Sequence, residues 1–150
     1  MNPSPARVTI LIADDDPDDR VLTRDAFNEV GMPVELIFVE DGDQLLDYLN
    51  RRGAYADAAV NPMPRLILLD LNMPRRDGRE VLAEIKNSPA LKHIPVVVLT
   101  TSKAEEDVLK SYQIGSNSYI VKPVSFAALT EVVREIGRYW LDTVDLPADS

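Results

Sequence analysis

Short apolar runs alternate along this chain with amphipathic segments, and this alternation constrains the fold more than any other feature. The runs are residues 7–13, 34–39, 66–69, 96–99 and 119–121. Runs of this length between polar residues are typical of strands that are buried on both faces. Strict alternation of strand and helix predicts a mostly parallel sheet with helices on both sides. We therefore expect an α/β fold with a doubly wound (βα)5 sheet.

The first helix carries clear start and stop signals. Asp16 in front of Pro17 predicts its beginning, with Asp18 and Asp19 in the first turn, and Gly31 predicts its end. Acidic side chains are favoured in a first turn because they face the positive end of the helix dipole. These preferences suffice to explain the three aspartates, so we assign them no other function.

Two segments depart from the regular alternation. Residues 51–64 contain Gly53 and two prolines and exceed a usual connection in length, so we expect a surface excursion there. The last helix is expected over about residues 125–141, before a loose tail at 142–150. Residues 1–150 then form a single domain with a core at about 7–141.

Composition and charge exclude several classes of function. The 150 residues suffice for one domain with a real core, and the absence of cysteine excludes disulfides and thiolate metal sites. The net charge of −9 disfavours binding to nucleic acid or anionic lipid. The sequence shows neither a signal peptide nor a segment long enough to span a bilayer, so we expect a cytoplasmic protein.

Four of the five apolar runs end on residues that a phosphoryl-transfer site would need. The first leads into Asp14 and Asp15, and the others into Asp70, Thr100 and Lys122. The carboxyl ends of parallel strands share one edge of a sheet, where open α/β sheets bind their ligands. In the flavodoxin-like strand order 2-1-3-4-5, the switch point lies between strands one and three. Those are the strands that end in the three aspartates.

These aspartates could hold a divalent cation. Carboxylates this close repel one another, and Mg²⁺ prefers one or two carboxylates together with waters and a phosphate oxygen. Asp15 and Asp70 suit direct ligation, with a backbone carbonyl of the following loop at Asn72, while Asp14 would ligate through water. The sequence therefore predicts a magnesium site at this edge.

Asp70 could also act as a nucleophile on a phosphoryl group and form an acyl phosphate. Lys122 would neutralise charge on the transferring oxygens, and the Thr100 hydroxyl could bond one of them. Each residue alone has an ordinary explanation at a strand end. Their joint occurrence at successive strand ends favours a functional site.

On these residues the chain resembles the receiver domains of response regulators in two-component signalling, the CheY-like family. The resemblance covers about residues 7–141 and rests on Asp14-Asp15, the loop Asp70-Leu71-Asn72-Met73-Pro74 with Gly78, Thr100, Tyr119 and Lys122-Pro123. It implies that Asp70 accepts a phosphoryl group from a sensor histidine kinase, with Mg²⁺ as cofactor. The chemistry would be self-catalysed phosphorylation and dephosphorylation rather than turnover of a substrate.

The resemblance also implies a conformational switch. Once Asp70 is phosphorylated, the Thr100 hydroxyl would move toward the phosphoryl group, and the Tyr119 ring would turn into the space that it leaves. Such domains usually carry a cis peptide bond between Lys122 and Pro123.

Within the family, several details resemble the stand-alone receivers that partner bacterial phytochromes. They are Asp16-Pro17-Asp18-Asp19, the long loop at 51–64, Asn117-Ser118-Tyr119 and Tyr139-Trp140. A bacteriophytochrome-type sensor kinase is therefore an expected partner. Because no residues remain for an output domain, we expect the signal to pass through protein contacts. The broad apolar stripe of the last helix predicts a homodimer through that helix and the strand at 119–121, with a possible share for the helix at 104–114.

Three other functions fit less well. An Mg²⁺-dependent aspartyl phosphohydrolase commonly has a second aspartate two residues beyond its nucleophile, where this chain has Asn72. A flavodoxin-like cofactor binder would need a Ser-, Thr- or Gly-rich loop after the first strand, where carboxylates here would repel phosphate. A scaffold without chemistry is disfavoured because every position needed for phosphorylation is intact.

Overall fold

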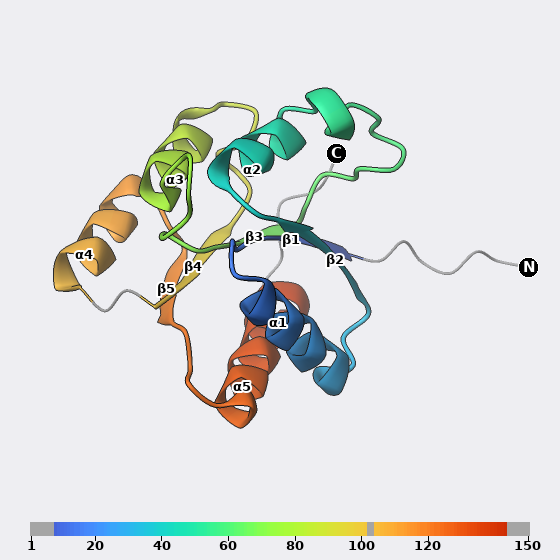
Figure 1. Cartoon of the computed structure of the whole chain (residues 1–150), viewed down its shortest axis with the longest axis vertical. Helices are drawn as coiled ribbons and strands as arrows, with labels where there is room; N and C mark the ends of the chain where they lie inside the picture. The colour runs from blue at the N-terminus through green and yellow to red at the C-terminus, as the bar shows by residue number, and fades with distance from the viewer. Residues whose placement is uncertain (1–7, 102–103, 144–150) are drawn as a thin grey trace, which may run out of the picture.

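The computed structural model describes residues 8–101 and 104–143. Its middle layer is a five-stranded parallel sheet in the order β2-β1-β3-β4-β5 (Figure 1). The strands are β1 (Val8–Ala13), β2 (Val34–Val39), β3 (Leu66–Leu69), β4 (Val96–Thr100) and β5 (Ser118–Val121). This order confirms the α/β class and the flavodoxin-like strand order that the sequence predicts.

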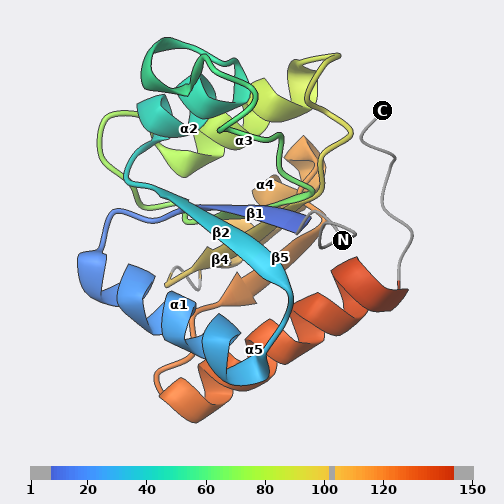
Figure 2. The same ribbon diagram turned by 90° about the vertical axis from the view of Figure 1, so that its right-hand side faces the viewer.

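Helices cover both faces of the sheet, as Figure 2 shows. One face carries α1 (Pro17–Val30) and α5 (Phe126–Ile136), and the other carries α2 (Gly42–Leu49), α3 (Gly78–Asn87) and α4 (Glu105–Ile114). A short 3-10 turn, η1 (Gly53–Tyr55), follows α2, and a π-helical segment, η2 (Gly137–Thr143), extends α5. Within the described ranges, none of the helices combines the length and apolarity needed to cross a membrane.

Alternate strand residues supply two apolar layers, one on each face of the sheet. In β1, Leu11 and Ala13 pack with α2 and α3, whereas Ile10 and Ile12 pack with α1 and α5. Side chains along a strand point alternately to the two faces, so a strand covered on both sides needs apolar residues at every position. All four residues of β3 are buried for this reason.

The boundaries of α1 agree with its sequence signals. The Asp16 carboxylate accepts hydrogen bonds from the backbone N–H groups of Asp18 and Asp19, and Pro17 occupies the first helical position. Gly31 ends the helix with a φ of 76°, a left-handed conformation that glycine adopts without steric cost.

The end of the chain differs in detail from the sequence prediction. Regular α-helix stops at Ile136, and the wider turns of η2 begin at Gly137, against which the end of the flexible Met32 side chain packs. Residues 142 and 143 still belong to η2, so the expected tail does not begin at 142. The rest of that tail, 144–150, and residue 7 of the expected core lie outside the described residues.

Residues 51–64 form the expected surface excursion, and one buried side chain anchors it. Tyr48 of α2 is 1% exposed, and its hydroxyl donates a hydrogen bond of 2.7 Å to the Pro62 carbonyl. The ring of Tyr55 lies against the Tyr48 ring at a centroid distance of 5.2 Å. Burial raises the pKa of Tyr48 to about 12.

Replacing Tyr48→Phe should remove this anchor while keeping the ring. We expect the free energy of unfolding to fall by about 1 kcal/mol at neutral pH, because the Pro62 carbonyl loses its donor. The pKa of Tyr48 is higher in the folded than in the unfolded chain, so wild-type protein loses stability as the pH rises from about 10 toward 12. The variant has no phenol at residue 48, so it should not lose the part of its free energy of unfolding that depends on this group as the pH rises. Urea unfolding at neutral pH and near pH 11 measures both effects, and an equally steep alkaline loss in the variant would contradict them.

Candidate functional site

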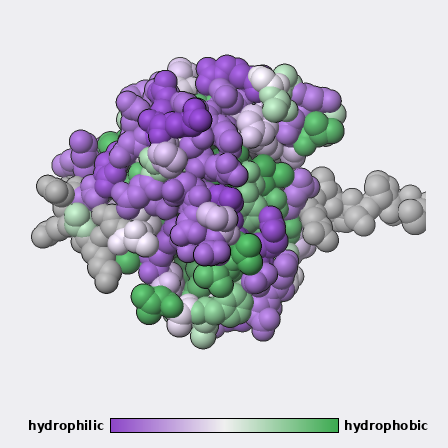
Figure 3. Space-filling view, in the orientation of Figure 1, coloured by the Kyte–Doolittle hydropathy of each residue, from purple (hydrophilic) through white to green (hydrophobic). Residues whose placement is uncertain are grey.

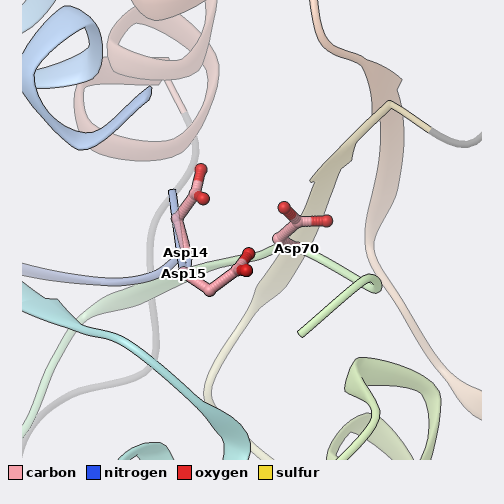
Figure 4. Close-up of side chains that lie close together, drawn as sticks. All are labelled: Asp14, Asp15 and Asp70. Carbon is pink, nitrogen blue, oxygen red and sulfur yellow. The ribbon is translucent and has the colours of Figure 1, made fainter. Parts of the chain in front are cut away.

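Three carboxylates meet at the carboxyl edge of the sheet, between β1 and β3. Asp14 and Asp15 follow β1 and Asp70 follows β3, and Figure 4 shows the three side chains grouped at the ends of these strands. The strands pair so that Ala13 lies beside Leu69, and the residues that follow are therefore neighbours. One oxygen from each carboxylate lies within 4.8 Å of those of the other two. The predicted convergence of the three aspartates is confirmed.

Asp14 is held from three directions. Its backbone N–H donates to the Val39 carbonyl of β2 at 3.0 Å, and its Oδ1 accepts from the Asp16 N–H at 3.0 Å. Arg20 Nη1 of α1 donates to the Asp14 carbonyl at 2.8 Å. The carboxylate is almost fully buried, whereas Asp15 is exposed. The cluster is therefore rigid at its base and open to solvent on the side of Asp15.

The two oxygens of Asp70 have separate partners. Oδ1 accepts from the Thr100 hydroxyl at 2.8 Å and from the Asn72 N–H at 3.0 Å. Oδ2 accepts from Lys122 Nζ at 3.0 Å. The following loop returns to the strand end, where Gly78 packs on the Asp70 carbonyl with no room for a Cβ atom. These contacts hold the carboxylate in one orientation.

Lys122 brings the only ammonium among these contacts. Its Nζ donates to Asp14 Oδ2 at 2.7 Å, to Asp19 Oδ2 at 2.9 Å and to Asp70 Oδ2 at 3.0 Å. Burial opposes its charge, but the hydrogen bonds to Asp14 and Asp19 and the charges of Asp14 and Asp70 prevail and raise the pKa of Lys122. Burial also raises the pKa of Asp14, and Lys122 offsets this only in part. Lys122 thus stays charged and neutralises part of the cluster.

Asp19 is the site residue that reasoning from the sequence missed. It lies in the first turn of α1, as helix-start preferences predict, but that explanation is incomplete because its carboxylate also binds Lys122, 103 residues away in the chain. The available signal was its place in the first turn of a helix that starts directly behind an acidic pair. Asp16 and Asp18 show only the predicted capping geometry.

Thr100 and Tyr119 project to the same face of the sheet. Tyr119 pairs with Val98 of β4, and Thr100 lies two residues beyond Val98, so alternation turns all three side chains the same way. Thr100 is fully buried, and Tyr119 is half-buried against the apolar layer that contains α2 and α3. The arrangement places the hydroxyl and the ring on the same face of neighbouring strands, and the hydroxyl contacts Asp70.

The Lys122–Pro123 peptide bond departs from the expectation. No cis peptide bond occurs between described residues, so this bond is trans. The trans form is the lower-energy isomer of an X–Pro bond, by about 0.5–1 kcal/mol. The expected cis bond is therefore wrong for this structure.

The family follows from the fold, this cluster and a comparison with known proteins. The sequence model of the response regulator receiver domain family matches residues 10–134 of this chain. The chain belongs to the response regulator receiver domain family. It is 45% identical over 145 residues to the response regulator Rcp1 of Synechocystis sp., a match that covers 97% of this chain and 96% of Rcp1.

Solved structures of two response regulators superpose closely on the chain. The phosphorylated cyanobacterial phytochrome response regulator RcpA has a TM-score of 0.88 and 44% identity, and the match covers 95% of this chain and 100% of RcpA. The Mn²⁺-bound form of Rcp1 has a TM-score of 0.85 and 45% identity, with 94% and 99% covered. Both similarities extend over nearly the whole chain.

Proposed function

We propose that Asp70 is the phosphoacceptor of this receiver domain and that Mg²⁺ binds beside it. The observation that carries the proposal is the position of the Asp70 carboxylate, which lies beside the carboxylates of Asp14 and Asp15 and accepts a hydrogen bond from the Lys122 ammonium. Four carboxylates and one ammonium leave this cluster strongly negative, and their hard oxygen donors suit a divalent cation such as Mg²⁺. Asp14, Asp15, Asp70 and the Asn72 backbone carbonyl would hold the ion.

In the proposed reaction, an Asp70 oxygen attacks the phosphorus of a phosphohistidine. The bond from phosphorus to the imidazole nitrogen breaks, the electron pair stays on that nitrogen, and an acyl phosphate forms on Asp70. Lys122 and Thr100 already donate to the two Asp70 oxygens and would redirect these hydrogen bonds to phosphoryl oxygens. A bound Mg²⁺ would neutralise further charge on those oxygens.

The same contacts support the proposed switch. In this structure the Thr100 hydroxyl donates its hydrogen bond to Asp70. A phosphoryl oxygen on Asp70 would accept that hydrogen bond instead and draw the Thr100 side chain outward. Movement of Thr100 would open space on the face that Tyr119 shares, so the ring could turn inward. Tyr119 would then convert phosphorylation into a change at the surface around β5 and α4.

We further propose a sensor histidine kinase of the phytochrome type as the phosphodonor. Rcp1 and RcpA are response regulators, and RcpA is described as a cyanobacterial phytochrome response regulator. The chain shares 44–45% of its residues with both over most of its length. A hydrolase is disfavoured because residue 72 is an amide and cannot serve as a general acid.

The proposal is tested by incubating the chain with acetyl phosphate and following intact mass. We expect one phosphoryl adduct that forms with Mg²⁺ and fails to form after chelation of divalent ions. Transfer from an autophosphorylated phytochrome kinase should give the same adduct. Labelling that is equal with and without divalent ions would argue against the metal site.

We also propose that copies of the chain pair through α5 and β5. The apolar stripe of the last helix is partly core, since Val133, Ile136 and Trp140 are buried. Phe126 and Tyr139, however, are 42% and 55% exposed, and Figure 3 shows apolar surface gathered over α1 and α5. Exposed aromatic side chains of this size favour an interface.

This pairing predicts a dimer by light scattering at high micromolar concentration. Replacing Phe126 and Tyr139 together by serine should shift the protein to monomer, because the apolar contacts are lost. Val60→Ser, a matched change in the 51–64 loop at a residue 67% exposed, should leave the dimer intact. A wild-type monomer in both phosphorylation states would contradict the proposal.

A further inference from the structure

The three hydrogen bonds of Lys122 differ in what would happen to them during phosphorylation. An ammonium has three protons, and here each has its own carboxylate acceptor, on Asp14, Asp19 and Asp70. When Asp70 becomes an acyl phosphate, its carboxylate charge disappears and a phosphoryl oxygen takes its place. The bond to Asp70 is therefore the one that passes to the phosphoryl group, while the other two remain to hold the ammonium.

Asp14 and Asp19 are not equivalent as holders. Asp14 belongs to the triad of metal-competent carboxylates, so a bound cation would share its negative charge and weaken its hold on Lys122. In the part of the chain that the structure describes, that triad does not include Asp19. Asp19 would thus keep its full attraction for Lys122 while the metal is bound.

The surroundings of Lys122 show why a second holder matters. A cavity of about 150 Å³ opens beside Asp19 and Lys122. Its walls are mostly apolar and include Leu22, Leu99, Val124 and Leu129. Without Asp19, the flexible lysine side chain could swing into this space and away from Asp70. The Lys122 side chain is 13% exposed, and on the side of this cavity Asp19 is the carboxylate that holds its ammonium.

We propose that Asp19 is a positioning residue for phosphoryl transfer, holding the Lys122 ammonium so that its third N–H points at the acceptor on Asp70. The inference rests on the proposed phosphoacceptor role of Asp70. Asp19 suits this task because α1 fixes its backbone, through Asp16, directly behind the acidic pair. It does not touch the reacting atoms and acts only through Lys122.

Two substitutions separate position from charge. Asp19→Asn and Asp19→Ala both remove the negative charge, but only asparagine keeps an oxygen that can accept from Lys122. With acetyl phosphate and Mg²⁺, we expect the alanine variant to be phosphorylated about three- to ten-fold more slowly than the asparagine variant. The alanine variant should bind Mg²⁺ by calorimetry at least as tightly as the asparagine variant, because Asp19 lies outside the triad and Lys122 competes with the metal for its oxygens. Equal phosphorylation rates in the two variants would overturn the proposal.

Asp18 provides the matched control. It lies in the same turn of α1 and is exposed, and its side chain has no hydrogen bond or ion pair among the described residues. Asp18→Asn and Asp18→Ala should therefore be phosphorylated at equal rates. A slower Asp18→Ala would show that the alanine effect comes from the helix turn and not from Lys122.

Two further measurements keep the result interpretable. If wild-type protein is not labelled, or if Asp70→Asn is labelled equally, the proposed function itself fails. If labelling is confined to Asp70 but Asp19→Asn and Asp19→Ala are labelled at equal rates, only this inference fails.

Nitrogen-15 NMR of the Lys122 ammonium gives a signature that does not depend on phosphorylation. Slow proton exchange of this group should persist in wild type and Asp19→Asn and be lost in Asp19→Ala. Persistence in Asp19→Ala would count against the proposal.

Discussion

Asp70→Asn is expected to abolish phosphorylation of this protein by acetyl phosphate and by its kinase. The amide that replaces the carboxylate cannot attack phosphorus and form an acyl phosphate. The fold should survive, because the asparagine oxygen can still accept from the Thr100 hydroxyl and from the Asn72 N–H, as Asp70 Oδ1 does. Lys122 also keeps its bonds to Asp14 and Asp19.

Intact-mass measurement of the phosphoryl adduct tests this expectation directly. Asp18→Asn is the control, since it removes an exposed carboxylate near the same strand end without touching the cluster. Thermal unfolding should show that both variants are folded. If Asp70→Asn acquires the adduct as fast as wild type, another residue is the acceptor and the assignment of the site is wrong.

Lys122→Ala has the second largest expected effect, and it acts on both rate and stability. Loss of a preorganised donor to the phosphoryl oxygens should slow phosphorylation about 100-fold or more. Without metal, Asp14, Asp19 and Asp70 would be left with no counter-ion, and the free energy of unfolding should fall by about 3 kcal/mol. Removing the ammonium also removes a competitor for the carboxylates, so the affinity for Mg²⁺ should rise.

Chemical unfolding with and without Mg²⁺, together with calorimetric titration of the metal, measures these changes. Because the cation binds the folded state, saturating Mg²⁺ should recover part of the lost stability. Lys92→Ala is the matched control, as Lys92 is exposed and its side chain makes no contact with the cluster. A variant with wild-type metal affinity would contradict the view that Lys122 and the metal compete for the same oxygens.

Much of the fold and site was predictable because both follow from local patterns and one topological rule. Apolar runs covered on both faces identify the strands, and Asp16 with Pro17 and Gly31 identify the limits of α1. Parallel strands present their carboxyl ends at one edge, so Asp14, Asp70 and Lys122 had to lie close together once the strands were recognised. The convergence of Asp14, Asp15 and Asp70 is a consequence of that rule.

Other features depend on how helices and loops pack, which no local pattern encodes. The burial of Ile136 and Trp140 against the exposure of Phe126 and Tyr139 depends on the angle at which α5 lies on the sheet. The anchor between Tyr48 and Pro62 joins residues of two separate segments. The trans bond before Pro123 likewise differs from what the resemblance implied.

Asp19 shows most clearly the difference between what the sequence determines and what tertiary packing decides. Its sequence position determined that it would lie in the first turn of a helix, where an acidic side chain needs no further explanation. Only the packing of α1 beside the end of β5 brought its carboxylate to Lys122. The pattern of apolar runs determines which residues reach the carboxyl edge of the sheet, because strands that alternate with helices and lie parallel all end at that edge. The rotation of a helix about its axis depends on contacts between distant segments, and the tertiary structure alone decides those.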